Sequence, residues 1–314
     1  MSAAFVFPGQ GSQAVGMGKA LAETFASARL IFEQVDEALG DKLSSVMWDG
    51  PADKLTLTEN TQPALVAVSL AAMRVLETEA GVNLARDASF VAGHSVGEYS
   101  ALAAAGALSL QDAVRLVRIR GRAMQQAVPV GVGAMAALMG VDFEQAAAIA
   151  ADAAQGEIVQ AANDNGGGQV VVSGHKAAVE RAVDVAKAKG VRRAMMLPVS
   201  GPFHSALMQP AADVMADALA KVAITRPCVP LVANVVAGPV TDPVQIVQGL
   251  VAQVTGTVRW RESVAFMTSA GVTAFHEVGS GKVLSALAKR IAEGVTAMAV
   301  GTPDDVAAFK AARV

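Results

Sequence analysis

A serine flanked by glycines, in the run Gly93-His94-Ser95-Val96-Gly97, is the part of the sequence best suited to chemistry. An apolar stretch, residues 88–92, precedes this run, and an alanine-rich stretch, residues 99–105, follows it. The pattern predicts a sharp turn between a strand and a helix, with the serine hydroxyl exposed above the helix N-terminus. Because Gly-x-Ser-x-Gly also occurs by chance in glycine-rich loops, the flanking elements carry the prediction that Ser95 is a nucleophile.

A serine needs a general base to react at neutral pH, and the chain offers four histidines. His204 follows the apolar run Met195–Val199 through a short loop. Open α/β sheets build their sites in loops at the carboxyl ends of strands, so His204 is the predicted base. The other three are expected in structural positions, in the turn itself, in a surface turn and at the end of an apolar strand: His94, His175 and His276.

The elements that would position these residues alternate between strand and helix. A short apolar strand is expected at Ala3–Phe7, and helical periodicity runs through residues 17–39, 63–80 and 109–127. Ser109 is the expected N-cap of the last of these helices. This alternation predicts an α/β fold with a parallel sheet that is covered on both faces.

The stretch between residues 131 and 197 has an order of its own. Strands are expected at 134–139, 158–162, 169–173 and 194–197, and helices at 143–154 and 177–189. This β-α-β-β-α-β order is typical of a ferredoxin-like subdomain. We therefore predict a catalytic core formed by residues 1–130 and 198–314, with a subdomain inserted at 131–197. The run Asn163–Gly168 is expected to be a plain hairpin loop.

The composition narrows the class of protein. With 314 residues, 53% of them hydrophobic, the chain can form one large core or a main domain with a smaller one. Its net charge of −3 and its dispersed charged residues indicate no basic patch that could bind nucleic acid. Its apolar runs are too short to span a bilayer. A single cysteine, Cys228, and a start without a basic, apolar leader favour the cytoplasm. No nucleic-acid or membrane partner is expected.

Two glycine-rich segments allow more than one interpretation. Gly9–Ala14 follows the first strand and imitates a dinucleotide-binding fingerprint, but Pro8 and the lack of an acid that ends a second strand count against it. Its backbone N–H groups could instead face a developing oxyanion. Gly279–Lys282 imitates the end of a phosphate-binding loop but lacks the required Ser or Thr, so a helix-starting turn is expected.

Four motifs in order resemble the malonyl-CoA:acyl carrier protein transacylase family. They are Phe7–Gln13, Gly93–Glu98, Arg118–Gly121 and Gly201–Ser205, and the resemblance runs nearly end to end. It implies an α/β-hydrolase-like core that carries a ferredoxin-like insertion. It also implies transfer of a malonyl group from malonyl-CoA to the phosphopantetheine thiol of acyl carrier protein, for fatty acid or polyketide synthesis.

The same resemblance implies roles for individual residues in catalysis. Ser95 would carry the malonyl group as an ester, in a ping-pong reaction, and His204 would act as base and then as acid. The backbone N–H groups of Gln10 and Val96 would form the oxyanion hole. The backbone carbonyl of Gln253 would orient His204, in place of an acidic side chain. No metal or bound cofactor is implied, since the CoA thioester and the phosphopantetheine thiol are substrates.

Two further residues would set specificity. Arg120 lies 25 residues after Ser95, as in the family, and would bind the malonyl carboxylate. A guanidinium can pair with a carboxylate through two parallel hydrogen bonds, which suits this role. Phe203, directly before His204, would narrow the space beside the malonyl α-carbon. Val96 stands where the family often has Leu, and only its N–H matters there.

Two other functions remain open at the level of the sequence. A serine esterase or thioesterase shares the nucleophile and the base but passes the acyl group to water, and it predicts an acidic third member and no carboxylate clamp. A nucleotide-binding oxidoreductase would require the segment Gly9–Ala14 to bind a dinucleotide.

Overall fold

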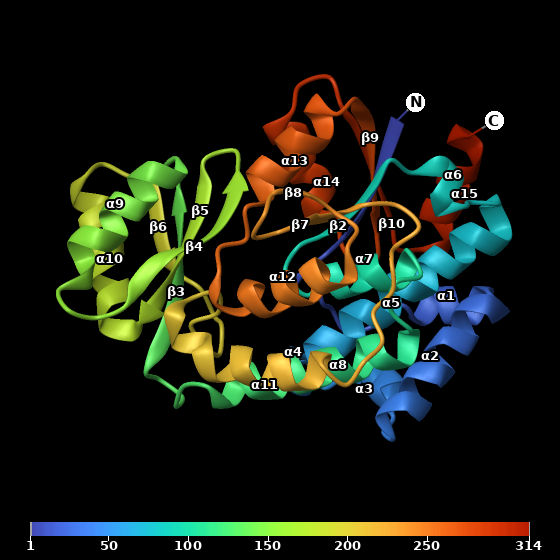
Figure 1. Ribbon diagram of the computed structural model, residues 1–314, viewed down its shortest axis with the longest axis horizontal. Helices are drawn as coiled ribbons and strands as arrows, with labels where there is room; N and C mark the ends of the chain where they lie inside the picture. Colours follow the sequence, from blue (N-terminus) through green and yellow to red (C-terminus); the bar gives the residue numbers. More distant parts are fainter. Residues whose placement is uncertain (1, 314) are drawn as a thin grey trace.

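The computed structural model describes residues 2–313 and contains a six-stranded main sheet (Figure 1). Its strand order is β10-β9-β1-β2-β7-β8, and all neighbours are parallel except the antiparallel pair β7–β8. This confirms the predicted parallel sheet. The strands are β1 (Ser2–Phe7), β2 (Phe90–Gly93), β7 (Leu231–Ala233), β8 (Gly238–Val240), β9 (Val272–Val278) and β10 (Thr296–Val300).

Side chains alternate between the two faces along each strand, so both faces of this sheet carry apolar residues and both are covered by helices. Phe5 and Phe7 belong to the larger core, whereas Ala4 and Val6 belong to a smaller core under α13 (Trp260–Ser269) and α14 (Val283–Ile291). The larger core takes buried side chains from α1 (Lys19–Thr24), α2 (Ala26–Leu39), α3 (Leu43–Asp49), α4 (Ala52–Thr56), α5 (Thr58–Ala80), α6 (Leu84–Asp87), α7 (Gly97–Ala104), α8 (Leu110–Gln126), α11 (Gln209–Leu219), α12 (Pro243–Thr255) and α15 (Pro303–Ala312).

Two helix boundaries differ from those expected. The helix predicted over residues 17–39 is divided at Phe25, whose backbone is extended, into α1 and α2. Helix α5 begins at Thr58 and contains Pro63, where the sequence predicts its start. Nearly all of its first nineteen residues are buried, so tertiary packing outweighs the local cost of proline. The expected N-cap of α8 is confirmed, since the Ser109 side chain accepts a hydrogen bond from the Asp112 N–H.

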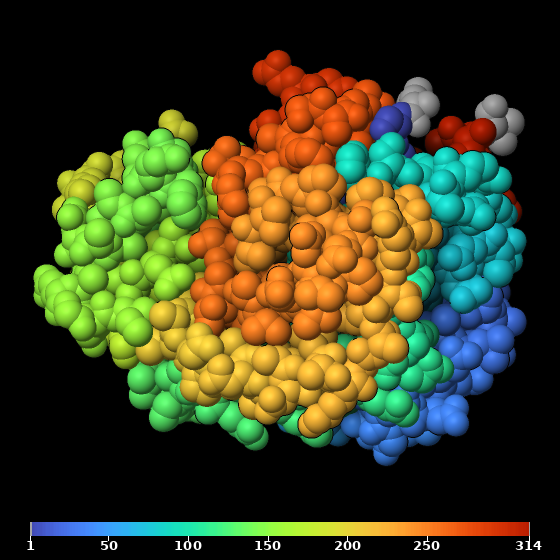
Figure 2. Space-filling view, viewed as in Figure 1, coloured from blue at the N-terminus to red at the C-terminus, as the bar shows by residue number. Residues whose placement is uncertain are grey.

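A second, four-stranded sheet lies at one end of the molecule (Figure 1), and the segment that forms it, coloured green to yellow, occupies the left side of the space-filling view (Figure 2). Its strands follow the order β4-β5-β3-β6, and all pairs are antiparallel, which is the predicted ferredoxin-like arrangement. Two helices pack on it around a separate core. Its elements are β3 (Gly133–Met139), α9 (Phe143–Ala154), β4 (Val159–Gly166), β5 (Gln169–His175), α10 (Lys176–Ala188) and β6 (Arg193–Met196). We propose residues 131–197 as the boundaries of this subdomain.

Two expectations for this region were wrong. The strand before His204 ends at Met196 and belongs to the small sheet, so His204 does not follow a strand of the main sheet. The run predicted as a hairpin loop continues β4 as far as Gly166, and the turn is confined to residues 167–168. Asn163, Asp164 and Asn165 are therefore buried strand residues. Packing against the main domain makes the strand longer than its local sequence indicates.

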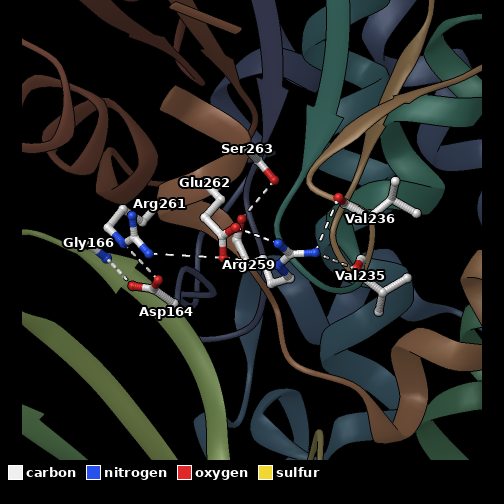
Figure 3. Close-up of polar contacts among 8 residues, drawn as sticks. All are labelled: Asp164, Gly166, Val235, Val236, Arg259, Arg261, Glu262 and Ser263. Atoms are coloured by element: carbon white, nitrogen blue, oxygen red, sulfur yellow. Dashed lines mark hydrogen bonds and ion pairs between the residues drawn. The ribbon is translucent and has the colours of Figure 1, made fainter. Parts of the chain in front are cut away.

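The segment that follows α12 joins the small sheet to the main domain (Figure 3). The Val258 N–H donates to Ala162 and the Asp164 N–H donates to Val258, both at 2.9 Å. Arg261 Nε donates to the buried carboxylate of Asp164 at 2.8 Å. Arg259 donates to the carbonyls of residues 235 and 236, in the loop after β7. These contacts fix β4 relative to the edge of the main sheet where β2 and β7 end.

Candidate active site

Ser95 lies on a tight turn between β2 and α7, as the sequence predicts. Its φ is +52°, in the left-handed region that non-glycine residues rarely adopt. A side chain at Gly93 would collide with the backbone of Gly97, and a side chain at Gly97 would collide with the Phe7 carbonyl. Glycine is therefore required at both positions because three backbone segments meet there.

Asn234, directly after β7, holds this turn in place. Its Oδ1 accepts from the Ser95 N–H at 2.8 Å, and its Nδ2 donates to the Gly93 carbonyl at 2.7 Å. The residue is fully buried, and its carbonyl accepts from the Arg259 N–H at 3.1 Å. A buried amide whose oxygen and nitrogen both have hydrogen-bond partners is a rigid support for the strained serine. Asn234 was not identified from the sequence.

His204 contacts both Ser95 and the carbonyl predicted to orient it. Its Nε2 lies 2.7 Å from Ser95 Oγ, and its Nδ1 lies 2.8 Å from the backbone oxygen of Gln253. A carbonyl can only accept a hydrogen bond, so Nδ1 carries the proton. The lone pair of Nε2 then faces the serine hydroxyl, which is the arrangement that a general base requires.

The electrostatic environment keeps His204 neutral. Burial, together with the nearby charge of Arg120, lowers the pKa of His204 to about 3. A neutral imidazole can accept the serine proton. No carboxylate contacts His204 within residues 2–313, so the acidic third member expected for a serine esterase does not occur in that part of the chain.

Arg120 is a buried cation beside the nucleophile. Only 1% of it is exposed, and its Nη2 donates to Ser95 Oγ at 3.1 Å. Two glutamine side chains also accept from it, Gln62 from Nη1 at 2.7 Å and Gln253 from Nη2 at 2.9 Å. No carboxylate lies within salt-bridge distance among the described residues, and Nε has no hydrogen-bond partner there. Such a guanidinium is suited to bind an anionic substrate group.

The neighbouring arginines of α8 have other partners. Arg115 donates to the Ala38 carbonyl, Arg118 pairs with Asp41 at 3.1 Å, and Arg122 pairs with Glu59 at 2.7 Å. Arg120 alone among these four contacts Ser95. The structure thus brings together Ser95, His204, Arg120 and Gln253, as the sequence analysis predicts.

A buried acid, Glu98, lies one helical turn after Ser95. It accepts from the Asn234 backbone N–H at 2.6 Å and from Nε2 of Gln253. Burial raises the pKa of Glu98, whereas these two hydrogen bonds and the charge of Arg120 lower it. Both of its oxygens accept hydrogen bonds, so the network holds the ionised carboxylate. Glu98 was assigned no role of its own from the sequence. The available signal was a single acid in an otherwise apolar helix.

A cavity of about 410 Å³ opens on these side chains, between the main sheet and the small sheet. Phe203, 6% exposed, lines it beside His204, as expected for a residue that limits substrate size. Asn163 and Asn165 of β4 also line the cavity. Asn165 also bonds to His94, with 2.9 Å between Oδ1 and Nε2. The segment predicted as a plain hairpin loop therefore contributes to the site.

The loop after β1 packs closely against the turn that carries Ser95. A side chain at Gly9 would approach the His94 carbonyl too closely, so glycine allows this contact. Within residues 2–313, no protein group accepts from the backbone N–H of Gln10 or of Val96. Helix α1 begins only at Lys19, so the segment does not open a helix as a dinucleotide-binding loop does.

The remaining histidines lie away from the serine hydroxyl. His175 Nδ1 accepts from the Ile158 N–H at 2.9 Å, and His276 packs between Phe5 and Phe309 with ring centroids 5.0 Å away on either side. The segment Gly279–Lys282 directly precedes α14, as expected. No group of three potential metal ligands occurs among residues 2–313, and no helix there is long and apolar enough to cross a membrane.

Known proteins resemble this chain over nearly its full length. The family model for the acyl transferase domain matches residues 4–307. The malonyl CoA-acyl carrier protein transacylase of Escherichia coli (strain K12) is 47% identical over 305 residues, which is 97% of each chain.

Solved structures agree with this relationship. The crystal structure of acyl-carrier-protein-S-malonyltransferase from Bartonella henselae superposes with a TM-score of 0.97, at 56% identity over 100% of both chains. A malonyl-transacylase in complex with its type II PKS acyl-carrier protein superposes with a TM-score of 0.96, at 42% identity over 99% of this chain and 100% of that one.

Proposed function

The chain belongs to the acyl transferase family, with malonyl CoA-acyl carrier protein transacylases as its relatives, and we propose that it transfers malonyl through an ester on Ser95. It is an acyltransferase that moves the malonyl group from malonyl-CoA to the phosphopantetheine thiol of acyl carrier protein. The observation that carries the proposed mechanism is the buried Arg120 in contact with a hydrogen-bonded Ser95–His204 pair. This combination supports attack on a thioester whose acyl group bears a carboxylate.

In the first half-reaction, Ser95 Oγ attacks the thioester carbonyl while its proton moves to His204 Nε2. The charge that develops on the carbonyl oxygen is stabilised by the N–H groups of Gln10 and Val96. Collapse of the tetrahedral intermediate breaks the carbon–sulfur bond, and CoA leaves with the proton held by His204. The product is a malonyl ester on Ser95.

In the second half-reaction, the phosphopantetheine thiol of acyl carrier protein gives its proton to His204 and attacks the ester. The same N–H groups stabilise the second intermediate. Its collapse releases Ser95, which recovers a proton from His204, and leaves malonyl on the carrier. The Gln253 carbonyl keeps His204 in the tautomer that both steps use.

Substrate choice follows from two side chains. Arg120 binds the malonyl carboxylate, and its burial (1% exposed) strengthens the pairing. Phe203 limits the room beside the α-carbon and so disfavours branched malonyl groups. Each step needs only proton transfer by His204, so the proposed mechanism uses no metal and no bound cofactor.

The product would serve fatty acid or polyketide synthesis. One structural relative is a malonyl-transacylase in complex with a type II PKS acyl-carrier protein, which supports the polyketide route as well as the fatty acid route. We also propose a cytoplasmic location, which fits a chain with one cysteine and hence no internal disulfide.

A transfer assay separates this function from that of a thioesterase. The protein is incubated with malonyl-CoA and phosphopantetheinylated acyl carrier protein, and malonyl-carrier and free malonate are quantified together. Malonyl-carrier should dominate. Release of malonate at a rate that matches CoA release, with no malonyl-carrier formed, would contradict the proposal.

A further inference from the structure

The Glu98 carboxyl group is the centre of a buried polar network beneath the site. Glu98 is 1% exposed and lies on the first turn of α7. Two N–H donors point at it from different elements, the backbone of Asn234 after β7 and the side chain of Gln253 in α12. No lysine or arginine forms an ion pair with it within residues 2–313. A buried carboxyl group held only by these two donors costs free energy, so a role beyond packing is expected.

Gln253 is connected to every reacting group of the site. Its Nε2 donates to Glu98 and, at 3.0 Å, to the Ser95 carbonyl. Its Oε1 accepts from Arg120 at 2.9 Å, and its backbone carbonyl accepts from His204 at 2.8 Å. One residue therefore fixes the nucleophile's backbone, the base and the predicted carboxylate clamp.

Glu98, together with the Ser95 carbonyl and Arg120, fixes which way the Gln253 amide faces. If the amide were rotated by half a turn, its NH₂ group would face the donors of Arg120 and its oxygen would face the acceptor oxygen of Glu98. Both contacts would be repulsive. An acceptor on one side and a donor on the other thus allow a single orientation of this buried amide.

Glu98 supports the nucleophile by a second route. Its other oxygen accepts from the Asn234 N–H, and the Asn234 side chain holds Ser95 and Gly93. From this geometry we propose that Glu98 is a positioning residue, which acts through Gln253 and Asn234 to align Ser95, His204 and Arg120. The inference rests on the roles proposed above for those three residues.

The substitution Glu98→Gln tests this proposal with little change in shape. A glutamine presents one acceptor to two donors, so either Asn234 or Gln253 loses its partner. Loss of one hydrogen bond to a charged group corresponds to about a 10-fold to 100-fold lower kcat/KM. The loss should occur with malonyl-CoA and with acetyl-CoA, because His204 serves both substrates.

Ser100→Ala is the matched control. Ser100 lies on the same helix, is equally buried, and its hydroxyl has no hydrogen-bond partner among the described residues. Its loss should leave kcat/KM with both substrates within about twofold of the parent value. The Tm of each variant is measured beside its kinetics, which separates loss of stability from loss of alignment.

A double-mutant cycle with Gln253→Ala shows whether Glu98 acts through its partner. The alanine removes the side-chain amide but keeps the backbone carbonyl that orients His204. In that background, Glu98→Gln should reduce kcat/KM by only about threefold or less, since coupled residues are non-additive. Glu98→Asp, which keeps the charge but retracts it, is the second variant if Glu98→Gln does not fold, and it should show the same coupling.

The outcomes are distinct. The proposal would be overturned if Glu98→Gln lowered only Tm and kept kcat/KM near the parent value, as Ser100→Ala is expected to do. It would also be overturned if Glu98→Gln lowered kcat/KM equally in the parent protein and in Gln253→Ala. Transfer that persists in Ser95→Ala would instead overturn the proposed function. The proposal is supported by a loss in Glu98→Gln that nearly disappears without the Gln253 side chain.

Discussion

The guanidinium of Arg120 lies in hydrogen-bond contact with the hydroxyl of Ser95, with 3.1 Å between Nη2 and Oγ. In a malonyl group, a single methylene separates the carboxylate from the thioester carbonyl. A carboxylate bound to Arg120 would therefore place that carbonyl close to Ser95 Oγ. The residue proposed to select the malonyl group is thus in direct contact with the proposed nucleophile.

Truncation of Arg120 should separate malonyl transfer from acetyl transfer. Arg120→Ala leaves the malonyl carboxylate unpaired in a buried site, at a cost of roughly 2–5 kcal/mol. Malonyl transfer should fall by about 30-fold to several thousand-fold. Acetyl-CoA has no carboxylate and should lose little by this route, so the ratio of the two kcat/KM values reports the effect.

Arg122→Ala provides the control for that experiment. Arg122 lies on the same helix, is largely exposed and pairs with Glu59, so its loss should change neither substrate by more than about twofold. Equal losses with both substrates in Arg120→Ala would show that Arg120 supports the fold and does not bind the carboxylate.

Removal of the base should slow both half-reactions. His204→Ala takes away the group that accepts the proton of Ser95, and general-base catalysis contributes about 10²-fold or more. The measurement is kcat for transfer to acyl carrier protein, together with the rate of CoA release in its absence. A variant that keeps kcat within a few-fold of the parent would show that another group acts as base.

The pH profile should respond to Arg120. Burial and the charge of Arg120 lower the pKa of His204 to about 3, so kcat/KM should stay high as the pH falls through 6 and decline only when His204 takes up a proton. Arg120→Ala removes one of these causes, so the acidic decline should move to higher pH. Acetyl-CoA is the substrate to use, because it does not need the clamp. A decline at unchanged pH in the variant would contradict this electrostatic coupling.

Phe203 should control tolerance for a branched substrate. The change Phe203→Ser opens the cavity beside the α-carbon, and one methyl group in such a pocket is worth about 1–3 kcal/mol. The ratio of methylmalonyl to malonyl transfer should rise by roughly tenfold. Competition between the two CoA esters, with both carrier products quantified, measures this ratio. An unchanged ratio would mean that another wall of the cavity sets the preference.

The sequence predicted those parts of the site that local patterns encode. Glycines on both sides of Ser95 indicated the turn, and the structure shows that backbone contacts require them. The helix predicted at 143–154 and the cap at Ser109 were confirmed because capping and periodicity are local properties. Arg120, His204 and Gln253 were identified through the resemblance to a family, and the structure brings them into contact with one another or with Ser95.

Other parts of the site depend on contacts between distant segments. Asn234 lies 139 residues from Ser95, and nothing in its own neighbourhood indicates that it holds the turn. The placement of His204 after a strand of the main sheet was also wrong, because residues 193–196 form the last strand of the small sheet, where the predicted order of the subdomain had put them. Asn163 and Asn165 look like turn residues, but pairing with β5 and a bridge to Val258 keep them in a strand.

The central claim is that Ser95 carries the malonyl group, and peptide mass spectrometry tests it most directly. The protein is mixed with malonyl-CoA without acyl carrier protein, quenched in acid, digested and compared with Ser95→Ala treated in the same way. We expect one malonyl group on the peptide that contains Ser95, its disappearance when acyl carrier protein is added before the quench, and no adduct in Ser95→Ala. A malonyl adduct of equal yield in Ser95→Ala, or transfer to acyl carrier protein without any adduct on the parent protein, would contradict the account.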